Sequence, residues 1–236
     1  MIATIINAVV VVIGGLIGSV FGNRIGEKYT GNIMTAIALV TMVIGVQGAV
    51  GTGNVLLVVV CLVLGTLLGT ALRLDDRLAG SGEFVKKKLQ NTRLGKGRVS
   101  DAFVTTSMLF CVGSMTIIGS IQAGLNQDYE IILTKSIMDF VSSVAFSAAL
   151  GAGVILSAIT VLVIQGGITL LAGVLAPFLT AQVVTEMSAV GGALFIGMAV
   201  NLLGLRQEKV RVGDMLPAIF LPIFYFPLAE LFGKFF

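Results

Sequence analysis

The polar residues that could do chemistry inside a membrane gather in one segment, Lys135 to Gly151, which reads KSIMDFVSSVAFSAALG. On a helix, a stripe of small and polar groups runs along one face at intervals of four residues: Asp139, Ser143, Ser147 and Gly151. A carboxylate facing lipid tails costs a few kcal/mol or more, so this stripe needs protein or water beside it. Ionisable residues inside a membrane are functional by default, and Asp139 is therefore the centre of our candidate pathway.

Two charged residues are potential partners of this acid. Lys135 lies four residues before Asp139, on the same helical face, and its long side chain can extend toward the membrane surface. Glu186, near the outer end of a later segment, is a second potential partner for Lys135, although an acid in the first turns of a helix is also well placed for purely electrostatic reasons. A structural ion pair between Lys135 and Asp139 is the alternative to a role in a pathway.

Four amides in or near apolar segments extend the candidate site: Asn7, Gln47, Gln165 and Asn201. One amide alone is more often a contact between helices, worth about 1 kcal/mol, than a ligand contact. A bundle this small has one interior, so we expect the amides and Asp139 to line one shared, solvent-reachable cavity. The predicted ion or solute pathway is Asp139, Ser142, Ser143, Lys135, Asn7, Gln47, Gln165, Glu186 and Asn201.

The absence of histidine from the sequence removes most enzyme chemistry from consideration. Serine-histidine catalysis, zinc-histidine sites and histidine proton relays all need that residue. Intramembrane aspartyl proteolysis needs two carboxylates together, and Asp139 is the one acid predicted to lie deep. Cys61 and Cys111 fall in apolar runs and predict neither a disulfide nor a metal site. We therefore expect no enzyme activity, cofactor or metal.

The composition is that of an integral membrane protein. Of the 236 residues, 56% are hydrophobic and only 11% are charged, and the mean hydropathy is +1.05; soluble domains carry roughly 25% charged residues. The net charge is +3, but the basic residues sit in connecting loops, which argues against nucleic-acid binding. The expected partners are the lipid bilayer and a small ion or solute.

Apolar segments long enough to span a bilayer predict a single all-α membrane domain over residues 1–236, a bundle of about eight transmembrane helices. The segments are Ile2 to Phe21, Asn32 to Val50, Asn54 to Leu72, Ala102 to Ile121, Ile131 to Leu150, Gly153 to Leu175, Gln182 to Leu203 and Met215 to Phe232. Only residues 151–153 separate the fifth from the sixth. Gly166 and Gly167 could unwind the sixth or give a close contact there, and three prolines predict a kinked last helix.

The loop charges predict the orientation. The connections that alternate spans place on one side carry all but two of the 15 basic residues, the exceptions being Lys135 and Lys234. The positive-inside rule then puts these connections in the cytoplasm and both termini outside. The longest connection, residues 73–100, has apolar residues on one helical face among basic ones, which predicts an amphipathic arm at the anionic inner surface. A regulatory or partner-binding arm is the alternative.

Glycine patterns predict tight helix packing. Gly14, Gly18 and Gly22 recur every four residues, and Gly65 with Gly69 repeats the pattern, which lets backbones approach closely within the subunit or in a homo-oligomer. A weaker signal relates residues 104–128 to residues 184–208. Similar segments in helices of opposite direction are what an inverted repeat would leave, although chance similarity of apolar helices is an equal alternative.

Three longer phrases carry a family resemblance: FVTTSMLFCVGSMTIIGSIQAGLNQD at 103–128, KSIMDFVSSVAFSAALGAGV at 135–154 and LAPFLTAQVVTEMSAVGGALFIGMAVNLLG at 175–204. Over nearly its whole length the chain resembles the bacterial inner-membrane protein family of unknown function that includes YdfK and YqgA. The resemblance implies a multi-pass protein of the bacterial cytoplasmic membrane. It transfers no substrate and no catalytic residue.

These observations lead to a functional hypothesis. The sequence predicts a small secondary transporter or channel for a small cation or a polar solute, with a midplane polar site around Asp139. The alternative is a non-transporting membrane scaffold or oligomeric assembly protein, in which the polar groups only satisfy one another.

Overall fold

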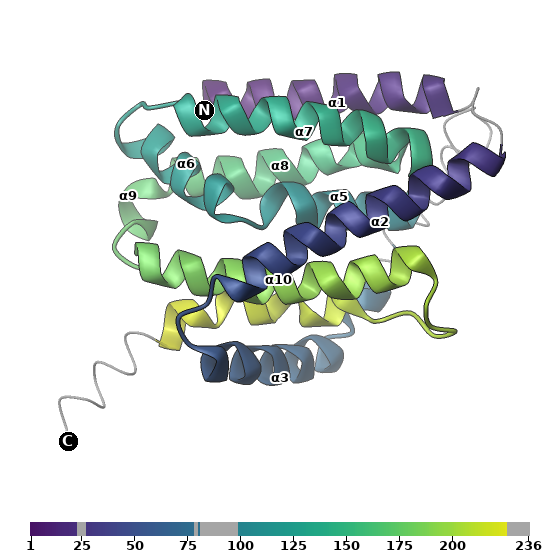
Figure 1. Cartoon of the computed structure of the whole chain (residues 1–236). Coiled ribbons are helices and arrows are strands. Elements are labelled where there is room, and N and C mark those ends of the chain that lie inside the picture. The colour runs from purple at the N-terminus through teal and green to yellow at the C-terminus, as the bar shows by residue number, and fades with distance from the viewer. Residues whose placement is uncertain (23–26, 78–79, 81–98, 226–236) are drawn as a thin grey trace.

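The computed structural model describes residues 1–22, 27–77, 80 and 99–225, and this part of the chain is helical, without a strand. The predicted all-α bundle is therefore confirmed. In chain order the helices are α1 (Ile2–Gly22), α2 (Glu27–Val50), α3 (Val55–Ala71), α5 (Val99–Cys111), α6 (Ser114–Leu125), α7 (Glu130–Leu150), α8 (Gly153–Leu170), α9 (Ala172–Leu175), α10 (Ala181–Leu203) and the 3-10 helix η2 (Val212–Phe220). In Figure 1, α1 lies along one side of the bundle and α3 along the opposite side.

The structure does not confirm a count of eight spans. In the described residues, five helices are long and apolar enough to cross a membrane, and the bent pair of α5 and α6 would make a sixth. The helices over Val55–Ala71 and Val212–Tyr225 are apolar but shorter. The predicted last span, residues 215–232, extends beyond the described residues. The chain is nonetheless a multi-pass membrane protein by the number of its long apolar helices.

Two glycines create the breaks in the helical run. Gly113 separates α5 from α6 with φ 156° and ψ 153°, and the two helices meet at a bend of 57°. Thr116 Oγ1 donates to the carbonyl of Phe110 across this break, at 3.0 Å, and satisfies a group that the bend would leave unpaired. Gly151 ends α7 with φ 97° and ψ −175°. Both conformations are essentially reserved for glycine.

The structure bears on two local expectations. Helix α8 runs unbroken through Gly166 and Gly167 and ends at Leu170, so these glycines do not unwind the segment. The last segment begins at Val212, and its first part, Val212–Phe220, is a 3-10 helix containing Pro217, a residue that cannot donate the backbone hydrogen bond of a regular α-helix. The proposed inverted repeat stays a prediction: α5 and α6 are bent against each other, whereas α10 is continuous.

Glycine-mediated contacts hold the bundle together within one subunit. A Cβ added to Gly18 would lie 2.2 Å from the carbonyl oxygen of Val144, so α1 and α7 are in backbone contact there. Ser147 Oγ adds a hydrogen bond to the carbonyl of Gly15 at 2.6 Å. On the opposite side of the bundle, a Cβ on Gly69 would lie 1.9 Å from the carbonyl oxygen of Asp214, which joins α3 to η2. The regularly spaced glycines of α1 and α3 thus coincide with close backbone contacts between helices.

Ion pairs gather the charged connections at one end of the bundle. Lys209, after α10, pairs with Asp101 at the start of α5 at 2.8 Å. Arg211 pairs with Asp76, after α3, and with the buried Asp214, each at 2.8 Å. Asp214, and after it Asp76, raise the pKa of the Arg211 guanidinium. This clustering agrees with the predicted alternation of the spans, which can be followed in Figure 1. Which side of the membrane faces the cytoplasm stays a prediction. The amphipathic arm over residues 73–100 also stays a prediction, because most of it lies outside the described residues.

Candidate functional site

The centre of the site is a buried ion pair on α7. The ammonium of Lys135 donates to Oδ2 of Asp139, four residues later, and each residue is only 6% exposed. The pair lies where α7 packs against α1 and α8, and the stripe predicted from the four-residue spacing continues along this face with the buried Ser143 and Ser147. Lys135 thus points into the bundle beside its acid.

Two amides from other helices complete the hydrogen bonding. Asn7 on α1 uses both hydrogens of its amide, one toward Oδ2 of Asp139 at 3.0 Å and one toward Oε1 of Gln165 on α8 at 2.9 Å. Its orientation follows from these partners, because the opposite assignment would place the amide oxygen against a carboxylate. Both amide residues are fully buried. Three helices therefore meet in one polar network.

The network continues along α1 and α8. Gln165 Nε2 lies 3.5 Å from Oγ1 of Thr4, and that hydroxyl lies 3.5 Å from Oγ1 of Thr169. The sequence analysis did not single out either threonine. Their spacing in the sequence could have identified them. Thr4 precedes Asn7 by three residues and Thr169 follows Gln165 by four, so each threonine shares a helical face with an amide of the site.

The ion pair also contacts the bent span. The Lys135 ammonium lies 5.8 Å from the centroid of the Phe110 ring on α5, within reach of a cation–π interaction. Phe110 stands three residues before Gly113, where α5 turns into α6. The cation of the site is thus linked to the segment whose backbone is broken. No sequence pattern distinguished Phe110 from the other aromatic residues of the chain.

Buried oxygen atoms near the pair are left without hydrogen-bond partners among the described residues. They are Oδ1 of Asn7 and Oγ of Ser143, with Oγ of Ser120 on α6 as a third case. Asn7 and Ser143 are fully buried. Carboxylate, amide and hydroxyl oxygens are the ligands that hard cations prefer. No three His, Cys, Asp or Glu side chains gather as metal ligands in the part of the chain that the structure describes.

The structure does not bring the other predicted residues to this network. Gln47 is exposed on α2. Asn201 donates to the carbonyl of Val210 and accepts from its amide, at 2.8 and 2.7 Å, and so closes the loop after α10. Ser142 is half-buried on α7. The expectation that Asp139 and all four amides line one cavity is therefore not met, since only Asn7 and Gln165 join Asp139.

Glu186 forms a separate buried site. Its carboxylate, 2% exposed, accepts from the amide of Gly53 at 2.8 Å and from the hydroxyl of Thr52, in the turn between α2 and α3. Along α10, Glu186 and Asn201 are 15 residues apart, which is about 22 Å in a helix. They cannot belong to one small site. Among the described residues Lys135 pairs with Asp139, while the partners of the Glu186 carboxylate are Thr52 and Gly53.

The two cysteines behave as their apolar surroundings predict. Cys61 and Cys111 are both free and both buried, Cys61 on α3 and Cys111 at the end of α5. Neither contributes a hydrogen bond to the polar network described above. They pack as small hydrophobic side chains in two different apolar clusters.

Comparison with known proteins places the chain in a family. The family model described as "Protein of unknown function (DUF554)" matches residues 2–226. The "Uncharacterized membrane protein YdfK" of Bacillus subtilis is 28% identical over 237 residues, covering 99% of both chains. The "Uncharacterized protein YqgA" of Escherichia coli is 27% identical over 223 residues, covering 94% of both. No solved structure matches significantly. The chain belongs to the DUF554 family, as its sequence phrases indicated.

Proposed function

We propose that the protein moves a small cation across the membrane, and that the Lys135–Asp139 pair is the site at which the cation exchanges. The observation that carries this proposal is the burial of both charges at the junction of α1, α7 and α8, where Asn7 and Gln165 hold them. Charged side chains inside membrane proteins are expensive and characteristically mark ion or substrate pathways.

Stability alone is a poor reason for such a pair. Burying two charges removes both from water, and their attraction often fails to repay that cost, so that apolar residues of similar volume are commonly as stable or more stable. The pair also occupies a helix that could be apolar throughout. A role that needs the charges, such as binding a cation from outside the protein, accounts for their presence more directly.

Lys135 would act as the internal competitor of the transported ion. A cation that displaces the ammonium from Asp139 would meet a carboxylate, the unpaired Oδ1 of Asn7 and, one turn along α7, the unpaired hydroxyl of Ser143. These oxygens suit a small hard cation. The displaced ammonium has the ring of Phe110 within reach, just before the bend of α5 into α6. Cation binding at Asp139 would in this way change the contacts of Phe110, next to the bend between α5 and α6.

The experiment is ion flux in liposomes that contain the purified protein, measured separately for protons, sodium and potassium. The decisive variant removes both charges together, Lys135→Met with Asp139→Asn, because it leaves no unpaired charge in the core. We expect it to fold and to lose flux. The matched control removes the pair at the end of the bundle, Lys209→Met with Asp101→Asn, where Lys209 is largely exposed, and should retain flux.

The alternative is a scaffold in which the pair is structural. One observation favours it: neither of the two described cavities has Asp139 or its amide partners in its lining. Wild-type protein that conducts none of the three cations, or a doubly neutral variant that conducts as well as wild type, would overturn the proposed role of the pair.

A further inference from the structure

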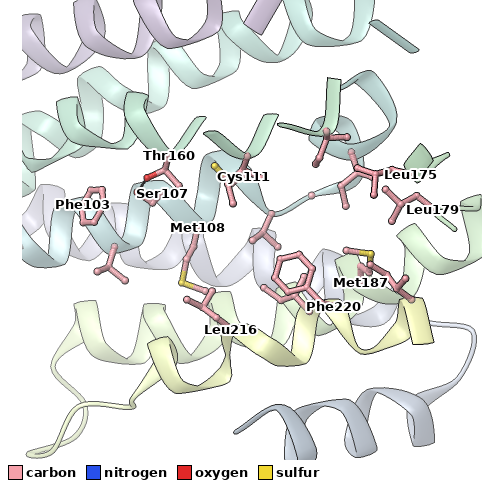
Figure 2. Close-up of a pocket in the computed structure, with 18 residues that line it drawn as sticks. Phe103, Ser107, Met108, Cys111, Thr160, Leu175, Leu179, Met187, Leu216 and Phe220 are labelled. Carbon is pink, nitrogen blue, oxygen red and sulfur yellow. Dashed lines mark hydrogen bonds between the residues drawn. The ribbon is translucent and has the colours of Figure 1, made fainter. Parts of the chain in front are cut away.

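A cavity of about 410 Å³ lies beside the bend between α5 and α6, and neither Lys135 nor Asp139 is among its lining residues. Its walls come from α5, α6, α8, α10 and η2, with residues of the α9 region closing one end. Figure 2 shows Phe103 at one end of the cavity and Leu175 with Leu179 at the other. The cavity is therefore elongated along the helices.

The lining of this cavity is almost entirely apolar. Among its described residues, Ser107 and Thr160 are the two with side-chain oxygen atoms, and none is charged. Their hydroxyls lie 3.0 Å apart and hydrogen-bond to each other, as their side-by-side placement in Figure 2 also indicates. A ligand in the cavity therefore needs to offer no polar group. Water has few partners in such a space, and apolar cavities of this kind stay dry and take up apolar molecules.

The dimensions point to a hydrocarbon chain. On α5 the lining extends from Phe103 to Cys111, eight residue steps or about 12 Å of helix, and continues to Gly113 at the bend. This length approaches half of the roughly 30 Å hydrocarbon core of a bilayer, which is the depth of one leaflet. Phe220, another lining residue, is 49% exposed, so the cavity reaches the outer surface of the bundle.

We propose that this cavity binds one acyl chain of a bilayer lipid, which enters from the surrounding membrane past Phe220. The site is distinct from the proposed cation site and does not depend on it. It sits against the bend of the broken span, so that the lipid chain fills the space between α5–α6 and the helices α8, α10 and η2.

The absence of tryptophan from the chain makes a direct test available. Met187→Trp places a single tryptophan in the cavity wall at a position that is 4% exposed. Phe146→Trp places one at a position that is equally buried, 5% exposed, in the other apolar cluster. Each variant is reconstituted in phospholipid with brominated acyl chains, because bromine quenches tryptophan emission at close range. Met108→Trp, 5% exposed in the same wall, is the substitute where Met187→Trp does not fold.

We expect the cavity tryptophan to lose most of its emission in brominated lipid and the Phe146→Trp control to keep it. Adding Ile168→Phe, which places a ring in the cavity wall and narrows the cavity, should restore part of the emission that Met187→Trp loses. The matched addition on the same helix, Ile159→Phe, lies at an exposed position outside the cavity and should not.

An equal fractional loss of emission from the cavity and control tryptophans in brominated lipid would overturn the proposal. So would quenching of Met187→Trp that Ile168→Phe leaves unchanged, since it would arise from lipid outside the cavity. A third arm adds a brominated free fatty acid to protein in unbrominated lipid. Quenching by the fatty acid and not by the brominated phospholipid would overturn the assignment to a bilayer lipid.

Discussion

The amide nitrogen of Asn7 lies 3.0 Å from Oδ2 of Asp139, so the first helix of the chain holds the carboxylate of a helix 132 residues further on. Replacing Asn7 with Leu removes this donor and leaves Oε1 of Gln165 without its partner. We expect a loss of about 1–3 kcal/mol of unfolding free energy, the cost of unsatisfied buried polar groups. Thermal unfolding in detergent, followed by circular dichroism, measures it. Gln47→Leu, an exposed amide, is the control and should unfold like wild type.

Separating the charges should be worse than removing both. Lys135→Met alone leaves the carboxylate of Asp139 buried without its cation and should cost about 3–5 kcal/mol of unfolding free energy. Lys135→Met with Asp139→Asn leaves no charge and should regain most of that loss. With Asp139→Asn alone as the second single variant, the comparison is a double-mutant cycle on unfolding free energies. A double variant as unstable as Lys135→Met would contradict the simple pairing described here.

The contact between α1 and α7 should not tolerate a single methyl group at its centre. Gly18→Ala would place a Cβ 2.2 Å from the carbonyl oxygen of Val144 and 2.9 Å from Cβ of Ser147, so the helices must separate. We expect a destabilisation of about 1–3 kcal/mol or more. Gly167→Ala is the matched control, because no atom lies within 4 Å of the added Cβ inside α8. It should stabilise by up to about 1 kcal/mol through helix propensity; equal melting temperatures for the two variants would refute the packing.

Gly113 should resist substitution for a different reason. No atom lies within 4 Å of a Cβ added there, but its φ of 156° is a conformation that other residues rarely adopt. Gly113→Ala should therefore cost about 1–3 kcal/mol through backbone strain alone. Gly31→Ala, in α2 and equally free of neighbours, is the comparison and should be neutral or stabilising. Thermal unfolding that ranks the two variants the other way would show that the bend is not set by this glycine.

Much of the site followed from helical spacing. The interval of four residues from Asp139 through Ser143 to Ser147 predicted one buried face of α7, and the structure buries all three. Asn7 lies 7 and 11 residues before Gly14 and Gly18, which puts it on the glycine face of α1, and all three are buried. In both cases the residues concerned lie on one helix, so the periodicity of that helix fixed their common direction.

The partners across helices could not be predicted in the same way. Gln47 and Gln165 have similar apolar surroundings in sequence, yet Gln165 meets Asn7 and Gln47 is exposed. The difference arises because Gly45 and Gly48 direct α2 against α10, which turns Gln47 outward. Likewise, the glycine stripe of α1 fitted a neighbour in the same subunit or in a second copy. Only the three-dimensional arrangement assigned it to α7.

The reach of Asn7 across the chain also bears on biosynthesis. Helix α1 is made before α7, and its buried amide and glycine stripe find their partners only when α7 has been translated, 132 residues later. At about 5–20 residues per second, that interval is roughly 7 to 26 s. During this time α1 must either wait at the insertion machinery or rest in lipid with its amide exposed. Assembly of the bundle therefore requires that α1 stays free to pack against α7 until α7 has been inserted.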